Sequence, residues 1–119
     1  MKILFASDIH GSAYYCRRLL DIYKETKASR MVILGDILYH GPRNDLPKEY
    51  APKEVIAMLN PLKDQIYAVR GNCDTEVDQM VLQFPILADY ALLVLDGKTF
   101  YATHGHVFNQ DHLPPMQDG

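Results

Sequence analysis

The chain has 119 residues, of which 12 are basic and 15 are acidic, so its formal net charge is −3. Hydrophobic residues make up 48% and charged residues 23%, which is typical of one soluble globular domain and not of a disordered or collagen-like chain. A weakly acidic protein has no general attraction for nucleic acid or anionic membranes. Any phosphate chemistry is therefore expected to be confined to a local site.

The cysteine content and the N-terminal sequence predict a cytoplasmic protein. Cys16 and Cys73 are too few for a disulfide framework. The first residues, MKILFASDIHG, hold a short apolar run that ends at Asp8 and His10, unlike the apolar region of a secretory signal. No apolar run approaches the roughly 20 residues that a membrane-spanning helix needs, so no membrane partner is expected.

Short apolar runs alternate with helical patterns along the chain. Residues 2–7 and 31–34 predict buried strands, and residues 65–69 predict a third strand. Ser12 is a candidate N-cap for a first helix, and Pro52 suits the first turn of a second one. The intervening residues 36–51 predict a long loop, and residues 77–81 predict a short third helix.

The last predicted element is a β-hairpin. Asp96 and Gly97 form a favoured turn pair between two apolar runs, residues 90–95 and 98–103. Strand, helix, strand, helix, strand and then a hairpin predict an α/β fold, with a parallel βαβαβ sheet extended by the antiparallel hairpin.

Polar side chains follow each predicted strand. Asp8 and His10 follow the first strand, Asp36 the second, Asn72 the third and His104 the last. Because the carboxyl ends of parallel strands meet at one edge of the sheet, the residues after the first three strands are expected to share a rim. Carboxylate, amide and imidazole ligands suit Mn²⁺, Fe²⁺ or Zn²⁺, and Mg²⁺ less well. Two such metals about 3.5–4 Å apart can clamp a phosphoryl group and activate a shared water.

The series D-x-H, GD, GN and H-G-H resembles the calcineurin-like metallophosphoesterases, and most closely the small bacterial phosphodiesterases of the YfcE type. The resemblance extends over almost the whole chain. It is carried by the stretches FASDIHGS, VILGDILYHGPRN, YAPKEVI, AVRGNCDTEVDQM, FPI and THGHVF. It implies a metallophosphoesterase-like α/β sandwich and a metal-dependent phosphodiesterase that acts on a small phosphodiester through a hydroxide bridging two metals.

The resemblance also implies a role for each polar residue. Asp8 and His10 would ligate one metal, Asp36 would bridge both metals, and Asn72 and His104 would ligate the second. Of these five residues, all but Asp8 are also expected to take part in catalysis. The two divalent ions are expected to be Mn²⁺, with iron, zinc or magnesium as alternatives.

The sequence departs from the family pattern in two places. Cys73 stands where many relatives carry a histidine often treated as the general acid, although relatives of the YfcE type share the cysteine. The leaving group would then be protonated by water or need no strong acid. The fifth motif, G-H-x-H, is absent, so residues 1–119 are interpreted as the N-terminal part of a metallophosphoesterase domain that is incomplete at its C-terminus.

Several alternatives stay open at this point. His40, Arg43, Asn44 and His106 could contact the substrate phosphate or only shape their loops. Asn72 could serve only to hold a left-handed turn. The chain could also be a non-catalytic scaffold for protein binding or an inactive fragment of an active parent, and the sequence leaves self-association undecided. The intact Asp-x-His pair favours the enzyme over the scaffold.

Overall fold

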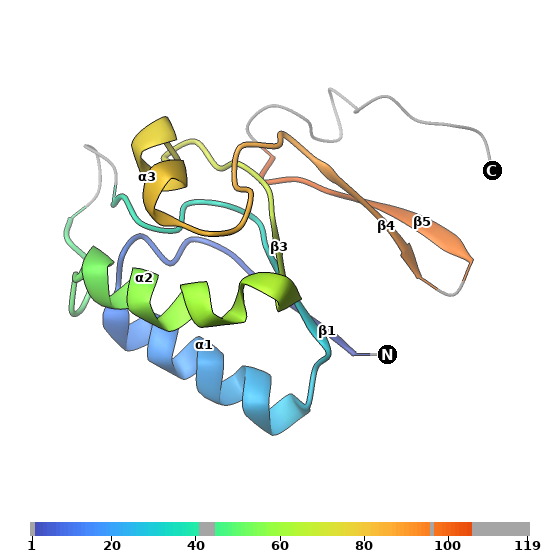
Figure 1. The fold of residues 1–119 in the computed structure, drawn as a ribbon, viewed down its shortest axis with the longest axis horizontal. Helices are drawn as coiled ribbons and strands as arrows, with labels where there is room; N and C mark the ends of the chain where they lie inside the picture. Colours follow the sequence, from blue (N-terminus) through green and yellow to red (C-terminus); the bar gives the residue numbers. More distant parts are fainter. Residues whose placement is uncertain (1, 41–44, 96, 106–119) are drawn as a thin grey trace.

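A parallel sheet of three short strands forms the centre of the fold (Figure 1). The structure is a computed structural model, and it describes residues 2–40, 45–95 and 97–105. The strands lie in the order β1-β2-β3, and all three run parallel; they are β1 (Ile3–Ala6), β2 (Arg30–Ile33) and β3 (Ile66–Ala68). The predicted parallel βαβαβ arrangement is confirmed.

Successive rows of side chains point to opposite faces of this sheet. The row that packs into the core consists of Leu4, Met31 and Ile66. The next row consists of Phe5, Val32 and Tyr67. Val32 in the central strand is buried, but Phe5 and Tyr67 are 48% and 51% exposed. The expectation of a buried strand is therefore correct for β2 and wrong for β1, because β1 is an edge strand with one uncovered face.

Two helices cover the inner face of the sheet. α1 (Ala13–Thr26) begins after Ser12, whose side chain accepts a hydrogen bond from the backbone nitrogen of Tyr15, as predicted for an N-cap. α2 (Pro52–Leu59) begins at the predicted proline. Both helices place buried side chains in the same core as the inward row of the sheet; these are Cys16, Tyr23, Val55 and Leu59.

Two short helices complete this layer. The chain continues from α2 into a 3₁₀ helix, η1 (Asn60–Gln65), which the sequence pattern did not reveal. α3 (Glu76–Val81) is the predicted short helix, and a capping box between Thr75 and Asp78 fixes its first turn. None of the helices in the described residues is long and apolar enough to cross a membrane.

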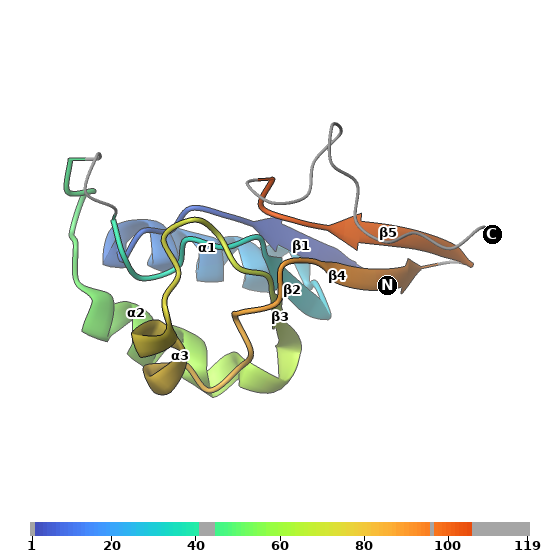
Figure 2. The same ribbon diagram turned by 90° about the horizontal axis from the view of Figure 1, so that it is seen from above.

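The predicted hairpin is confirmed, but it does not extend the parallel sheet. β4 (Ala91–Leu95) and β5 (Lys98–Ala102) pair with each other as a separate two-stranded sheet. The reason is that the hairpin lies on the side of the parallel sheet away from α1 and α2 and projects away from it, rather than pairing along its edge (Figure 2). Side chains of both sheets line the cavity between them, which has a volume of about 360 Å³; they are Ile3, Arg30, Val32, Tyr67, Ala91, Leu92, Leu93 and Val94.

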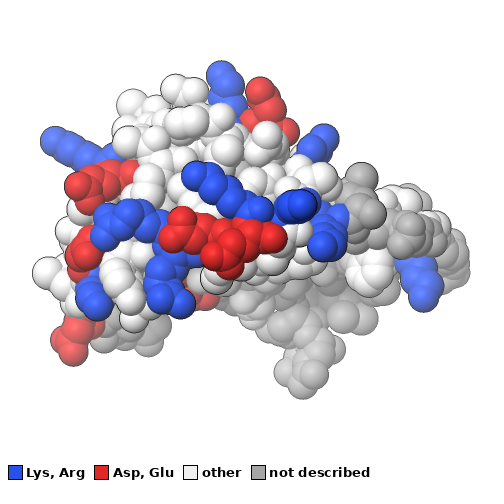
Figure 3. All heavy atoms as spheres, turned by 90° about the horizontal axis from the view of Figure 1, so that it is seen from below, with Lys and Arg blue, Asp and Glu red and all other residues white. Residues whose placement is uncertain are grey.

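Charged side chains on the face shown in Figure 3 are of mixed sign. Lysine and arginine side chains alternate with aspartate and glutamate side chains there, and Arg17 forms an ion pair with Glu49. Among the described residues, this face therefore shows no extended patch of one charge.

Candidate metal centre

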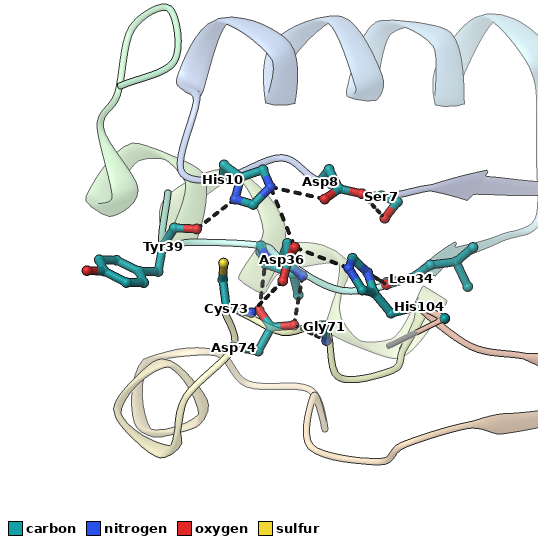
Figure 4. A network of polar contacts seen from close by, with 12 residues as sticks. Ser7, Asp8, His10, Leu34, Asp36, Tyr39, Gly71, Cys73, Asp74 and His104 are labelled. Atoms are coloured by element: carbon teal, nitrogen blue, oxygen red, sulfur yellow. Dashed lines mark hydrogen bonds and ion pairs between the residues drawn. The ribbon is translucent and has the colours of Figure 1, made fainter. Parts of the chain in front are cut away.

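The polar residues that follow the strands come together at the carboxyl edge of the parallel sheet (Figure 4). Asp8 and His10 lie after β1, Asp36 after β2 and Cys73 after β3, while His104 follows β5 of the hairpin. Two groups of side chains have ligand atoms that all lie within 4.8 Å of one another: Asp8 with Asp36 and His104, and His10 with Asp36 and Cys73. Asp36 belongs to both groups.

Backbone hydrogen bonds hold the loops after β1 and β2 together. The amide of Asp8 donates to the carbonyl of Gly35 at 3.0 Å, and the amide of His10 donates to the carbonyl of Asp36 at 2.8 Å. Asp8, His10 and Asp36 all adopt left-handed backbone conformations, with φ of 59°, 50° and 56°. This conformation is uncommon for residues other than glycine and is often found at functional sites.

Gly71 allows the loop after β3 to approach Asp36. A Cβ atom at this position would overlap the Asp36 carboxylate and would lie 2.6 Å from the Asp36 backbone nitrogen. Only glycine therefore fits between β3 and the loop after β2 without moving either one.

Asp36 is the central residue of the site and is only 1% exposed. Its Oδ1 accepts a hydrogen bond from the backbone amide of Cys73 at 2.7 Å. Its Oδ2 lies 3.3 Å from Nε2 of His104 and 3.6 Å from Nε2 of His10. Burial raises the pKa of Asp36, and contact with Asp8 adds to this, although the Cys73 amide and His104 oppose it. The chain thus holds a carboxylate where its charge needs a cationic partner.

Both histidines are oriented by backbone carbonyls. Nδ1 of His10 lies 2.8 Å from the carbonyl oxygen of Tyr39, and Nδ1 of His104 lies 2.6 Å from that of Leu34. Because a carbonyl oxygen can only accept, each Nδ1 carries the proton and donates it. In the neutral ring this leaves the lone pair on Nε2, which is the arrangement of metal-binding histidines.

The remaining charges at the site favour a carboxylate at Asp8 and a proton on His10. Burial tends to lower the pKa of His10, but the Tyr39 carbonyl and the nearby Asp8 and Asp36 carboxylates outweigh it, so the pKa is raised. Burial tends to raise the pKa of Asp8, but hydrogen bonds from Ser7 and the contacts with Asp36, His10 and His104 lower it overall. A divalent cation bound beside the two carboxylates could take the place of a proton on Nε2 of His10.

The other candidate residues are less closely tied to this centre. Asn72 is exposed, but it lies between Gly71 and Cys73, both of which are in contact with the network around Asp36. The ring of His40 packs edge-on against Tyr39 and Tyr50, with ring centroids 5.1 and 5.2 Å away. Arg43, Asn44 and His106, which could contact the substrate or only shape their loops, lie outside the described residues.

Asp74 is an important residue that the sequence analysis did not single out. Asp74 is 4% exposed, and its carboxylate accepts hydrogen bonds from the backbone amides of Asp36, Ile37 and Gly71, at 2.8, 3.0 and 2.7 Å. Asp74 therefore fixes the loop after β2 to the loop after β3. The only hint in the sequence was its position directly after the Gly-Asn-Cys stretch. That hint was weak, because an acidic residue in a loop is often simply exposed to solvent.

The comparison with family models decides the relationship. The model described as calcineurin-like phosphoesterase matches residues 1–117. The chain belongs to this family. It is 49% identical over 116 residues to phosphodiesterase YfcE of Escherichia coli K12, and the same identity is found with that of E. coli O157:H7. The match covers 98% of this chain and 63% of the relative, so the chain spans less than two thirds of the curated relatives' length.

Solved structures agree with this relationship. The structure of YfcE, a phosphoesterase from E. coli, superposes with a TM-score of 0.94 at 49% identity, covering 98% of this chain and 64% of that one. A Streptococcus pneumoniae protein described as a predicted phosphoesterase gives a TM-score of 0.51 at 23% identity, covering 92% of this chain and 48% of that one. The second likeness shows the fold alone.

Proposed function

We propose that the chain carries the metal-binding site of a metal-dependent phosphodiesterase with two divalent cations, Mn²⁺ first among them. The observation that supports this most strongly is the position of Asp36, which is buried and belongs to both groups of potential ligands. A carboxylate shared in this way suits a bridging ligand. Bound there, the two cations would neutralise the phosphoryl oxygens and lower the pKa of a water that they share.

Each residue of the centre would have a distinct role in holding the cations. Asp36 would be shared by the two positions, since its Oδ2 faces Nε2 of both His10 and His104. His10 and Asp8 would hold the first cation, and His104 and Asn72 the second. Asp8 is assigned to the His10 side because its Oδ1 lies 3.0 Å from Nε2 of His10, although it also belongs to the group with Asp36 and His104. The carbonyls of Tyr39 and Leu34 keep the protons of both histidines on Nδ1, so that Nε2 faces the centre. Asp74 keeps the backbone of Asp36 in place.

The relatives named phosphodiesterase support a phosphodiester as the substrate class. Cys73 stands at the position where a general acid would be expected from the family pattern. A thiol is a weak acid at neutral pH, so a diester with a good leaving group is the substrate that depends least on protonation. An activated aryl diester is therefore the first substrate to test.

The experiment is hydrolysis of bis-p-nitrophenyl phosphate by the 119-residue chain with added Mn²⁺. We expect turnover that disappears with a chelator and in Asp36→Asn, while Asp64→Asn, an exposed carboxylate on η1, keeps the full rate. Circular dichroism verifies that each variant is folded. Absence of turnover from a folded chain that binds Mn²⁺ would overturn the proposal for this chain and favour an inactive fragment.

A further inference from the structure

The thiol of Cys73 lies at the metal centre but has no part in the function proposed above. Its sulfur lies within 4.8 Å of ligand atoms of His10 and Asp36, and Figure 4 shows it pointing toward His10. The Cys73 side chain is buried, and its backbone amide is hydrogen-bonded to Asp36 Oδ1 at 2.7 Å. The sulfur is thus held beside the residue that both groups of ligands share.

The two groups of ligands differ in chemical softness. Asp8, Asp36 and His104 offer two carboxylates and one imidazole, which are hard and borderline donors. His10, Asp36 and Cys73 offer an imidazole, a carboxylate and a sulfur. Thiolate ligands select zinc and similar metals, whereas carboxylates also suit manganese and magnesium. The same centre therefore has one side suited to Mn²⁺ and one suited to thiophilic cations.

We propose that Cys73 is a direct ligand for thiophilic divalent cations, so that His10, Asp36 and Cys73 together bind Zn²⁺ or Co²⁺ through nitrogen, oxygen and sulfur. The inference rests on the proposed function, since it concerns the same centre. It adds a residue that sets metal preference: Zn²⁺ would be bound through the sulfur, whereas Mn²⁺ would be bound without it.

The geometry allows this coordination after small movements. Ligand atoms about 2.0–2.3 Å from a tetrahedral zinc ion lie about 3.6 Å from one another. Because the three ligand atoms already lie within 4.8 Å of one another, each pair needs to approach by about 1.2 Å at most. When the sulfur–metal bond forms, the S–H bond breaks and its proton passes to solvent.

The second cysteine provides a matched control. Cys16 is fully buried in α1 within the hydrophobic core. Burial raises the pKa of its thiol to about 11. Among the described residues, Cys16 belongs to no group of potential metal ligands, so a sulfur signal from a bound metal cannot come from it.

The test is a titration of the chain with Co²⁺, followed by near-ultraviolet absorption, where thiolate-to-cobalt charge transfer gives a band. We expect the band in the wild-type chain and in Cys16→Ser, and its loss in Cys73→Ser. Competition titration should show that Cys73→Ser weakens Zn²⁺ binding at least tenfold and changes Mn²⁺ binding less than twofold. If Cys73→Ser does not fold, Cys73→Ala replaces it.

Two results would overturn the inference: cobalt bound to the wild-type chain without the band, or a band that persists in the folded Cys73 variant. These results are separate from a failure of the proposed function. Mn²⁺-dependent diester hydrolysis with no sulfur band would reject Cys73 as a ligand and leave the phosphodiesterase proposal standing. A sulfur band without hydrolysis would support Cys73 as a ligand and reject the phosphodiesterase proposal for this chain.

Discussion

The loops after the three parallel strands and the hairpin β4–β5 supply the centre in different ways. Hydrogen bonds between backbone amides and carbonyls connect the first two loops. The Asp74 carboxylate connects the second loop to the third by accepting hydrogen bonds from three further backbone amides. The hairpin contributes one residue, His104, whose ring reaches the carbonyl of Leu34 and the carboxylate of Asp36. The loop residues of the centre are therefore held by buried backbone hydrogen bonds, whereas His104 is held through its own side chain.

This difference has a physical consequence for mutations. A change in the loops after β2 and β3 disturbs buried backbone groups, which lose hydrogen bonds that water cannot replace. A change at His104 removes a ligand but leaves those loops as they are. Mutations in the loops should therefore weaken both stability and metal binding, whereas a mutation of His104 should weaken metal binding with little loss of stability.

The largest effect on stability is expected from Asp74→Ala. It leaves three buried amide donors without an acceptor, each worth about 1–3 kcal/mol, so the free energy of unfolding should fall by about 3 kcal/mol or more. Urea denaturation measures this loss. Asp74→Asn keeps one acceptor oxygen and should lie between Ala and wild type. As a control, Asp78→Ala removes a helix-capping carboxylate and should lower the free energy of unfolding by about 1 kcal/mol. Equal losses for Asp74→Ala and Asp78→Ala would contradict the role of Asp74.

A smaller effect on stability is expected from Gly71→Ala. The new methyl group would overlap the Asp36 carboxylate, so the loops must separate, which should lower the free energy of unfolding by about 1–3 kcal/mol. Mn²⁺ affinity, measured by calorimetry, should fall at least tenfold because Asp36 moves.

The control for this variant is Gly97→Ala in the hairpin turn. Gly97 has a positive φ of 78°, and no atom of the described residues lies within 4 Å of an added Cβ. Its replacement should lower the free energy of unfolding by about 1 kcal/mol through backbone strain alone, with Mn²⁺ affinity unchanged. If Gly97→Ala weakened Mn²⁺ binding as much as Gly71→Ala, the close approach at Gly71 would not explain the effect.

The smallest effect on stability is expected from His104→Ala. Loss of the hydrogen bond to Leu34 should lower the free energy of unfolding by about 1 kcal/mol or less. Calorimetry should show one bound Mn²⁺ instead of two. Thr99→Ala, at an exposed position of β5, controls for damage to the hairpin and should still bind two. A His104→Ala variant that still binds two ions would show that the hairpin is not needed for the second position.

Much of this arrangement could be predicted from the sequence. The strands and helices follow from apolar periodicity and from Ser12 and Pro52 at helix starts, and the meeting of Asp8, His10 and Asp36 follows from parallel strands that end at one edge. The position of the hairpin did not follow, because in the described residues β4 and β5 pair with each other and share only a cavity with the outward side chains of the parallel sheet.

The hydrogen bonds and backbone conformations that hold Asp36 in place could not be predicted from the sequence either. The left-handed conformations of Asp8, His10 and Asp36 arise from hydrogen bonds between loops that are far apart in the chain. The role of Asp74 depends on three amides from two loops that meet only in the folded structure. Local sequence preferences carry no information on such contacts.

The account depends most on Asp36 as a carboxylate shared by two metal positions. Anomalous diffraction from crystals of the chain grown with Mn²⁺ tests this directly. We predict two manganese peaks about 3.5–4 Å apart, both in contact with the Asp36 carboxylate. A single peak, or two peaks of which only one touches Asp36, would contradict the shared role.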